Sequence, residues 1–365
     1  MPPTNQRSIP RALGFRMPAE WEPHEATWIA WPHNRDDWPG RFAPVPWVYA
    51  EIVRKLSRVE RVRILVEDEI LEQVARRLLR KADAAMEAVE FFRYPTNRVW
   101  TRDYGPLFVK NRRGKVGMTA WRFNAWAKYD DWRLDAAVPA FLAKKLSLRA
   151  WQAAMVLEGG SIDVNGAGLL MTTEECLLSE VQARNPGMTR AAIEKTLRAY
   201  LGVERVIWLR NGIAGDDTHG HVDDLARFVS ADTVVIATER DRSDANYEPL
   251  RENAALAREA GVRVIPLPMP APLVFCGRRL PASYANFYIA NGLVLVPTFN
   301  DPSDRLALNV IAGAFPDRAV TGIDCTSLIW GLGALHCMTQ QQPAAGAVLA
   351  TETRRPRRKD RGKQE

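Results

Sequence analysis

The segment 225–238, LARFVSADTVVIAT, has two runs rich in apolar and β-branched residues on either side of the turn residues Ser230, Ala231 and Asp232. This arrangement predicts a β-hairpin. The apolar spacing of residues 245–260 then predicts a helix, and VRVIPL at 262–267 predicts another strand. A strand pair, a helix and a further strand form one unit of an α/β fold.

Similar units recur roughly every 60 to 75 residues, about five times along the chain. No Pro/Ser-rich linker divides them, so the sequence predicts a single ring-like α/β domain over residues 14–345, with a flexible segment at 1–13 and a basic disordered tail at 346–365. Further helices are predicted at 46–58, 71–86, 132–146, 188–201 and 304–314, and strands or extended segments at 27–31, 62–66, 89–95, 99–111, 117–124, 155–164, 168–173, 205–209, 286–290, 293–299 and 319–324.

Composition narrows the class of protein. The chain has 365 residues, 47% of them hydrophobic, and a formal charge of +7. The last fifteen residues carry seven Arg and Lys against three acids, so the rest is near +3, and nucleic-acid binding is expected at most through this tail. No apolar run approaches the roughly 18 residues of a membrane helix, and no signal peptide is recognised. Four well-separated cysteines favour a reduced, cytoplasmic protein.

Two motifs carry candidate reactive groups. In GLGALHCMTQQQP (331–343), Cys337 follows a glycine-rich turn and precedes a polar run, which favours an exposed reactive thiol; Cys276, among apolar residues, is expected to be buried. In GDDTHGHVDD (215–224), His221 and Asp223 are two residues apart. If this segment is extended, both side chains point to one face.

Two acidic motifs complete the candidate set. Asp103 lies in VWTRDYGP after Trp100, and Glu158 ends an apolar run before two glycines. A carboxylate at a buried strand end needs a cation or hydrogen-bond donors. Carboxylates, an indole, a histidine and a cysteine together suit a planar cation such as a guanidinium, which carboxylates bind through paired N–H groups.

The chain resembles agmatine deiminases and the related bacterial peptidylarginine deiminases. The similar motifs occur in the family order: MPAEWEPHEATWIAWP (17–32), WTRDYGP (100–106), LEGGSIDV (157–164), RNPG (184–187), GDDTHGHVDD, YANFYIANG (284–292) and ALHCMTQQQP (334–343). The resemblance implies the pentein fold, a five-bladed α/β propeller. It also implies hydrolysis of a guanidinium C–N bond, with agmatine giving N-carbamoylputrescine and ammonia, and with no cofactor or metal.

The resemblance also implies roles for individual residues. Cys337 matches the family nucleophile, His221 its acid/base partner and Glu158 the residue that orients the histidine. Asp103 and Asp223 match the two guanidinium-binding carboxylates, and Trp100 a common aromatic neighbour. Three positions depart from the family pattern: Leu332 replaces a glycine, Ala334 an asparagine, and Asp224 the asparagine of HVDN.

Several alternatives remain open from sequence. The amine end of the substrate could contact Asp216, Asp217, Trp31 or Trp330. Of these, we expect Asp217 to bind it. Another guanidine, including peptidylarginine, could replace agmatine. A zinc hydrolase would use His219, His221 and Asp223. A catalytically silent binding protein with an RNA-contacting tail is the remaining class, and a homo-oligomer stays open.

Overall fold

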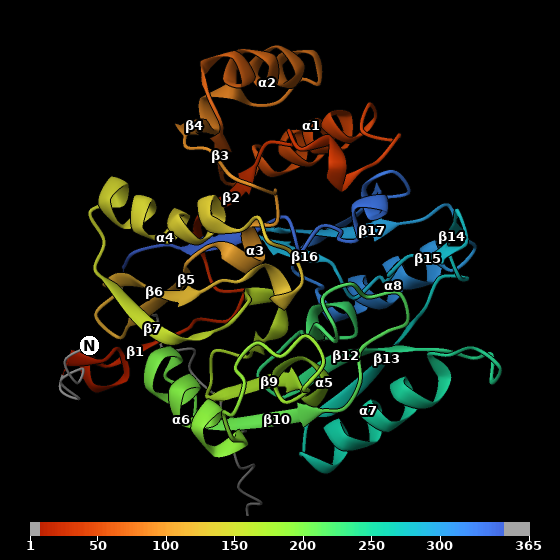
Figure 1. Ribbon diagram of the computed structural model, residues 1–365. Helices are drawn as coiled ribbons and strands as arrows, with labels where there is room; N and C mark the ends of the chain where they lie inside the picture. The colour runs from red at the N-terminus through yellow and green to blue at the C-terminus, as the bar shows by residue number, and fades with distance from the viewer. Residues whose placement is uncertain (1–7, 347–365) are drawn as a thin grey trace, which may run out of the picture.

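The structure has five β-sheets with a shared strand connectivity within residues 8–346, the part of the chain that the computed structural model describes (Figure 1). Each contains an antiparallel pair followed by a strand parallel to its second member. The sheets are β1 (Phe15–Arg16), β5 (Leu107–Asn111), β6 (Val116–Arg122), β7 (Ala150–Val156); β8 (Asp163–Val164), β9 (Leu169–Thr173), β10 (Arg205–Leu209); β11 (Ala226–Phe228), β12 (Thr233–Thr238), β13 (Arg263–Pro268); β16 (Tyr288–Ala290), β17 (Leu293–Thr298), β18 (Ala319–Asp324); and β19 (Gln340–Pro343), β2 (His24–Ala30), β3 (Arg61–Val66), β4 (Val89–Arg93). The predicted fivefold recurrence is therefore confirmed.

Helices connect the parallel strands of each sheet, as a parallel pair requires a crossover. They are α1 (Val45–Leu56), α2 (Glu69–Lys81), α4 (Arg133–Leu146), α6 (Arg190–Leu201), α7 (Tyr247–Glu259) and α8 (Asp304–Ala314). Figure 1 shows α1, α2, α4, α6 and α7 at the periphery of the molecule. Each predicted helix is present, although α2 spans Glu69–Lys81 rather than the expected 71–86. The Asp68 side chain accepts from the Leu71 N–H and caps the N-terminus of α2. In the described range, none of the helices has the length and apolar character that a membrane span would need.

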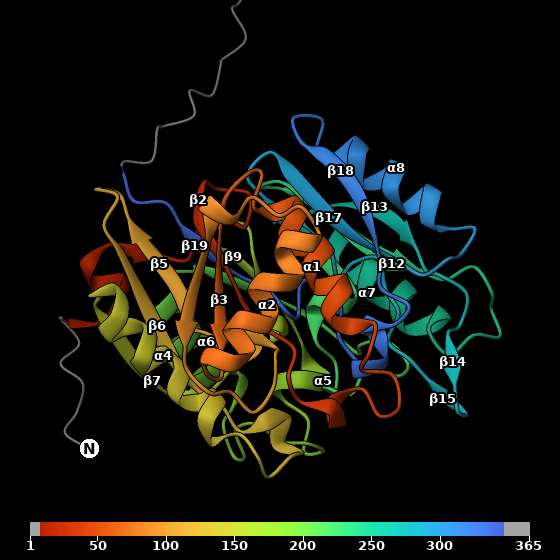
Figure 2. The ribbon, with the colours of Figure 1, turned by 90° about the horizontal axis from the view of Figure 1, so that it is seen from above.

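The chain closes on itself through β19, which pairs antiparallel with β2 near the N-terminus (Figure 2). The polar run after Cys337 is thus a buried strand: Gln340, Gln341 and Gln342 are all at most 7% exposed. The Gln342 amide has partners in the neighbouring strands, since Trp28 Nε1 and Arg63 Nη1 both donate to Gln342 Oε1. This pairing fixes the loop that carries Cys337 against β2.

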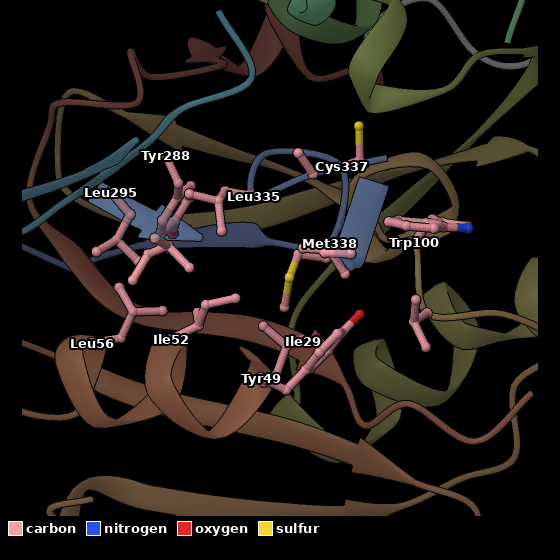
Figure 3. Close-up of a cluster of buried hydrophobic side chains, with 14 of the residues drawn as sticks. Ile29, Tyr49, Ile52, Leu56, Trp100, Tyr288, Leu295, Leu335, Cys337 and Met338 are labelled. Carbon is pink, nitrogen blue, oxygen red and sulfur yellow. The ribbon is translucent and has the colours of Figure 1, made fainter. Parts of the chain in front are cut away.

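One apolar cluster runs beneath this loop and includes α1, β2 and β17. Figure 3 shows Met338 pointing toward Ile29 and Tyr49, whereas the sulfur of Cys337 points the other way. The core therefore anchors the loop through Met338 and leaves the neighbouring thiol on its opposite side.

Two local predictions need correction. Residues 99–111 are not continuously extended, because α3 (Thr101–Tyr104) interrupts them before β5. The Thr101 hydroxyl bonds to the carbonyls of Trp28 and Met338, tertiary contacts that local pattern does not encode. Of the predicted N-terminal segment, residues 8–13 contact the domain, with Trp151 Nε1 donating to the Ser8 carbonyl at 2.7 Å; residues 1–7 and the tail from 347 lie outside the described range.

Candidate active site

Cys337 lines a cavity of about 300 Å³. The thiol is only 6% exposed, and Cys276 is exposed on the hairpin formed by β14 (Val274–Phe275) and β15 (Arg278–Arg279). Both sequence expectations of cysteine exposure are therefore wrong. Apolar neighbours in sequence do not bury a residue at a hairpin turn, and a reactive thiol at the end of a cavity has little surface of its own.

Asn286, which sequence reasoning did not single out, holds Cys337 in place. Its Oδ1 accepts from the N–H groups of His336 and Cys337 at 2.9 and 3.4 Å, and its Nδ2 lies 3.0 Å from Cys337 Sγ. From the other side, the Arg102 N–H donates to the Cys337 carbonyl. The YANFYIANG and WTRDYGP motifs thus fix both faces of the loop.

His221 is fully buried among three carboxylates. Nδ1 lies 3.9 Å from oxygens of both Asp103 and Asp223, and Nε2 lies 3.8 Å from Glu158. These distances are too long for hydrogen bonds, and both ring nitrogens lack a partner. Burial opposes the imidazolium, but the charge of Asp103, with Cys176 and Glu158 adjacent, outweighs it and raises the pKa of His221 well above its ordinary value.

The His221 backbone differs from the expected strand. His221 precedes a 3-10 helix at Val222–Asp224, so the extended interpretation is wrong. The Asp216 carboxylate accepts from the N–H groups of Gly220 and His221, and the resulting turn still brings the Asp223 carboxylate to the imidazole. The juxtaposition is as predicted, but a turn produces it.

Asp103 is fixed by two donors. Its Oδ1 accepts from the Gly160 N–H at 3.0 Å and its Oδ2 from Trp126 Nε1 at 2.9 Å. Trp126 is a further site residue that sequence reasoning missed, and it lies in a left-handed turn in which Ala125, Trp126 and Ala127 all have positive φ. Such a conformation is costly for residues with a Cβ, so its presence beside the cavity is consistent with a functional constraint.

Glu158 and Asp223 each have a buried partner. Burial opposes ionisation of Glu158, but Arg184 Nε at 3.1 Å outweighs it and lowers the pKa of Glu158 to about 2. Burial also opposes ionisation of Asp223, but the hydrogen bond from His336 Nδ1 at 2.7 Å outweighs burial and lowers the pKa of Asp223. Both carboxylates are therefore anionic at neutral pH.

Asp224, the departure from HVDN, has the opposite behaviour. Burial and the charge of Asp223 raise the pKa of Asp224 well above its ordinary value. Its protonated form is neutral and carries both a donor and an acceptor, as an asparagine amide does. Its Oδ1 accepts from Asn286 Nδ2 at 2.9 Å. The substitution thus preserves the charge pattern of the site.

The candidates for the substrate tail separate in the structure. Asp217 and Trp330 line the cavity, but Asp216 serves the His221 turn, and Trp31 is buried against Tyr49. The Asp217 carboxylate is already bonded to Lys128, Arg278 and Tyr129. Asp37, which sequence reasoning missed, also lines the cavity, and its Oδ2 is buried without a hydrogen-bond partner.

The proposed zinc ligands do not come together. The His219 ring lies against Ser179 and Glu175, at 3.1 and 3.7 Å, whereas His221 lies between Asp103, Asp223 and Glu158. The set of His219, His221 and Asp223 therefore does not form one coordination site.

Gly160 is required by the space available at the site. A Cβ there would lie 2.6 Å from His221 Nδ1 and 2.8 Å from Asp103 Oδ1. We expect Gly160→Ala to lower kcat/KM by at least about 100-fold, because it displaces the groups that bind and position the reactants. Gly187→Ala is the control, since no atom lies within 4 Å of a Cβ there, although its φ of +78° costs some stability. Equal kinetic effects of the two substitutions would contradict the prediction.

Leu332 adopts the conformation that the family glycine would favour, with φ of 71°. A residue with a Cβ is destabilised there by about 1 kcal/mol or more. Leu332→Gly and Leu332→Ala remove the same contacts, but only glycine relieves the backbone. We expect the glycine variant to unfold at a higher denaturant concentration than the alanine variant, by about 1 kcal/mol in free energy. An alanine variant of equal or greater stability would disprove this strain.

Comparisons with known proteins identify the class that this fold and site define. Residues 16–343 match the family model of the Porphyromonas-type peptidyl-arginine deiminase. An agmatine deiminase from Pseudomonas aeruginosa is 38% identical, covering 93% of this chain and 99% of that protein. The solved agmatine deiminase of Enterococcus faecalis has a TM-score of 0.85 at 33% identity, covering 92% of this chain and 98% of its own. A C. jejuni agmatine deiminase with a cysteine-to-serine substitution and substrate bound has a TM-score of 0.84 at 31% identity, covering 92% and 97%.

The chain belongs to the agmatine deiminase and bacterial peptidylarginine deiminase family. It is a hydrolase that acts on C–N bonds of amidines and has the α/β fold of that family.

Proposed function

We propose that this protein is an agmatine deiminase, which converts agmatine and water into N-carbamoylputrescine and ammonia in the cytoplasm. The observation that carries the proposal is that Asp103 and Cys337 line one cavity, and that the buried His221 imidazole lies 3.9 Å from both Asp103 and Asp223. Cys337 Sγ lies 3.8 Å from Asp223 Oδ2, so a guanidinium held by the carboxylates has its carbon beside sulfur.

The proposed first step forms a carbon–sulfur bond. Burial, together with the charges of Asp223 and Asp103, raises the pKa of Cys337 well above its ordinary value in the empty site. A bound guanidinium offsets those charges and favours the thiolate. Attack on the guanidinium carbon gives a tetrahedral adduct, His221 gives a proton to the departing nitrogen, and ammonia leaves.

The second step releases the product. The covalent S-alkylthiouronium is attacked by water, from which His221 removes a proton. The carbon–sulfur bond then breaks, leaving a carbamoyl product and the Cys337 thiol. Glu158, held by Arg184, stabilises the charged imidazole in both steps.

A cationic tail suits the outer part of the cavity. Its lining has five aspartates against two arginines, and those arginines are engaged by Asp37, Asp131 and Asp217. With Asp217 already bonded, the free Oδ2 of Asp37 is the better partner for the distal ammonium. Asp37→Asn should therefore raise KM for agmatine more than it lowers kcat.

Ammonia release tests the substrate. Purified protein is incubated with agmatine, free arginine or an N- and C-blocked arginine peptide, with Cys337→Ala as the blank. We expect release from agmatine and none above the blank from the peptide. Release from the peptide alone would replace agmatine with peptidylarginine.

Asp103 should set the acidic limb of the pH profile. Burial raises its pKa to about 6, with Asp223 and Glu158 adding to this and His221 opposing it. The carboxylate binds guanidinium only when ionised, so kcat/KM is half-maximal near pH 6, approaches its full value about one unit higher, and falls about tenfold per unit well below pH 6. Asp103→Asn should remove this limb from the residual activity, whereas Asp36→Asn should retain it. If kcat/KM of Asp103→Asn fell at acidic pH as in the wild type, another group would be responsible for that fall.

A further inference from the structure

A second thiol lies behind the imidazole. Cys176, in α5 (Glu174–Leu177), is 1% exposed, and its donor atom lies within 4.8 Å of donor atoms of His221 and Glu158, which are also within 4.8 Å of each other. The Cys176 N–H donates to the Thr173 hydroxyl, which donates to the Gly220 carbonyl. The short helix is thereby tied to the loop that carries His221.

Three nitrogen and oxygen atoms of this group have no hydrogen-bond partner. Both ring nitrogens of His221 and Glu158 Oε2 are buried without a hydrogen-bond partner. Arg184 binds the other oxygen of Glu158 and donates to the carbonyls of Gln182 and Thr218, so it leaves Oε2 free. Buried polar atoms without a hydrogen-bond partner lower the stability of the folded protein, and a ligand that binds these atoms removes that cost.

Sulfur, imidazole and carboxylate donors suit a thiophilic divalent cation. Donors of tetrahedral zinc lie about 3.4 to 3.6 Å apart, given its usual bond lengths. His221 Nε2 and Glu158 Oε2 are 3.8 Å apart, so shifts within about 1 Å would complete the site. A second group of possible metal ligands consists of Asp223, Asp224 and Cys337. These side chains already have hydrogen-bond partners, His336 for Asp223 and Asn286 for the other two.

We propose that Cys176, His221 and Glu158 form an inhibitory binding site for Zn²⁺ or a similar thiophilic divalent cation. Binding releases two protons to solvent, one from the Cys176 thiol and one from a ring nitrogen of the His221 imidazolium, and the metal then binds the thiolate and the freed nitrogen lone pair. The metal binding stands independently of the substrate, whereas the inhibition rests on the proposed acid/base role of His221. We expect the cation to enter by the cavity that Cys337 and Asp103 line, since Asp103 Oδ1 lies 3.9 Å from His221 Nδ1.

Metal binding is tested with Zn²⁺ alone, by elemental analysis of gel-filtered protein and by thermal unfolding. Wild type, Cys337→Ser and the exposed-thiol control Cys276→Ser should retain one equivalent of Zn²⁺ and unfold at a higher temperature. Cys176→Ser should bind at least about 10-fold more weakly. In activity assays, the Zn²⁺ concentration for half-inhibition should rise by the same factor in Cys176→Ser.

A spectroscopic measurement covers the case in which Cys176→Ser does not fold. Co²⁺ added to Cys337→Ser should give sulfur-to-metal charge-transfer absorption, because Cys176 remains the site thiol. Absence of this absorption would overturn the proposal, as would Zn²⁺ binding that is lost in Cys337→Ser but kept in Cys176→Ser. Binding without loss of activity would overturn the inhibitory role, and neither result bears on whether agmatine is the substrate.

Discussion

Replacing Cys337 with alanine is expected to lower turnover by at least about 10⁴-fold, because no other group can form the covalent intermediate. The buried side chain is small, and its polar contacts are to Asn286 and Asp223. Asn286 keeps its bonds to the His336 N–H and to Asp224. We therefore expect the free energy of unfolding to change by only about 1 kcal/mol, which separates lost chemistry from lost structure.

Acid-quenched mass spectrometry gives a direct measurement. During turnover, wild-type protein should gain the mass of agmatine less ammonia on the peptide that contains Cys337, and Cys337→Ala should gain nothing. The matched control is Cys276→Ala, an exposed thiol outside the cavity, which should retain full activity and the adduct. An alanine variant with more than about one percent of wild-type turnover would contradict the covalent mechanism.

The fold was largely predictable because its unit repeats. Residues 225–238 form the predicted hairpin, and α7 and β13 complete that unit as expected. β-branched runs, turn residues and helical spacing are local signals, and each of the five repeated units contains them. Sequence could not show that β19 pairs with β2, because that contact joins the ends of the chain.

The site was predictable only in part. The charged candidates around His221 converge as expected, because buried carboxylates near a histidine and a cysteine need a common partner. Asn286, Arg184 and Trp126 were missed as individual residues, although the first two lie in motifs that resemble the family. Their roles depend on backbone groups and left-handed turns, which leave no periodic pattern.

Glu20 illustrates such a missed role, and we expect Glu20→Ala to destabilise the protein by about 3–5 kcal/mol. Its carboxylate is 5% exposed and pairs with His336 Nε2 at 2.8 Å, Arg227 Nη2 at 2.9 Å and Arg102 Nη2 at 3.4 Å. Burial opposes its ionisation, but Arg227 and His336 outweigh this and lower the pKa of Glu20 well below its usual range. Removing the anion leaves buried cationic groups short of a partner.

Glu22→Ala is the matched control, two residues away in the same motif. Its ion pair with Arg16 is partly exposed, so its loss should cost about 1 kcal/mol or less. Denaturant unfolding of the two variants measures the difference, and stabilities equal within 1 kcal/mol would show that Glu20 is not the central anion of this network. Because His336 also holds Asp223, kcat/KM of Glu20→Ala should fall even where the protein remains folded, while that of Glu22→Ala should not. The two readouts together would show that the N-terminal motif stabilises the closed ring and orients a guanidinium-binding carboxylate through one buried glutamate.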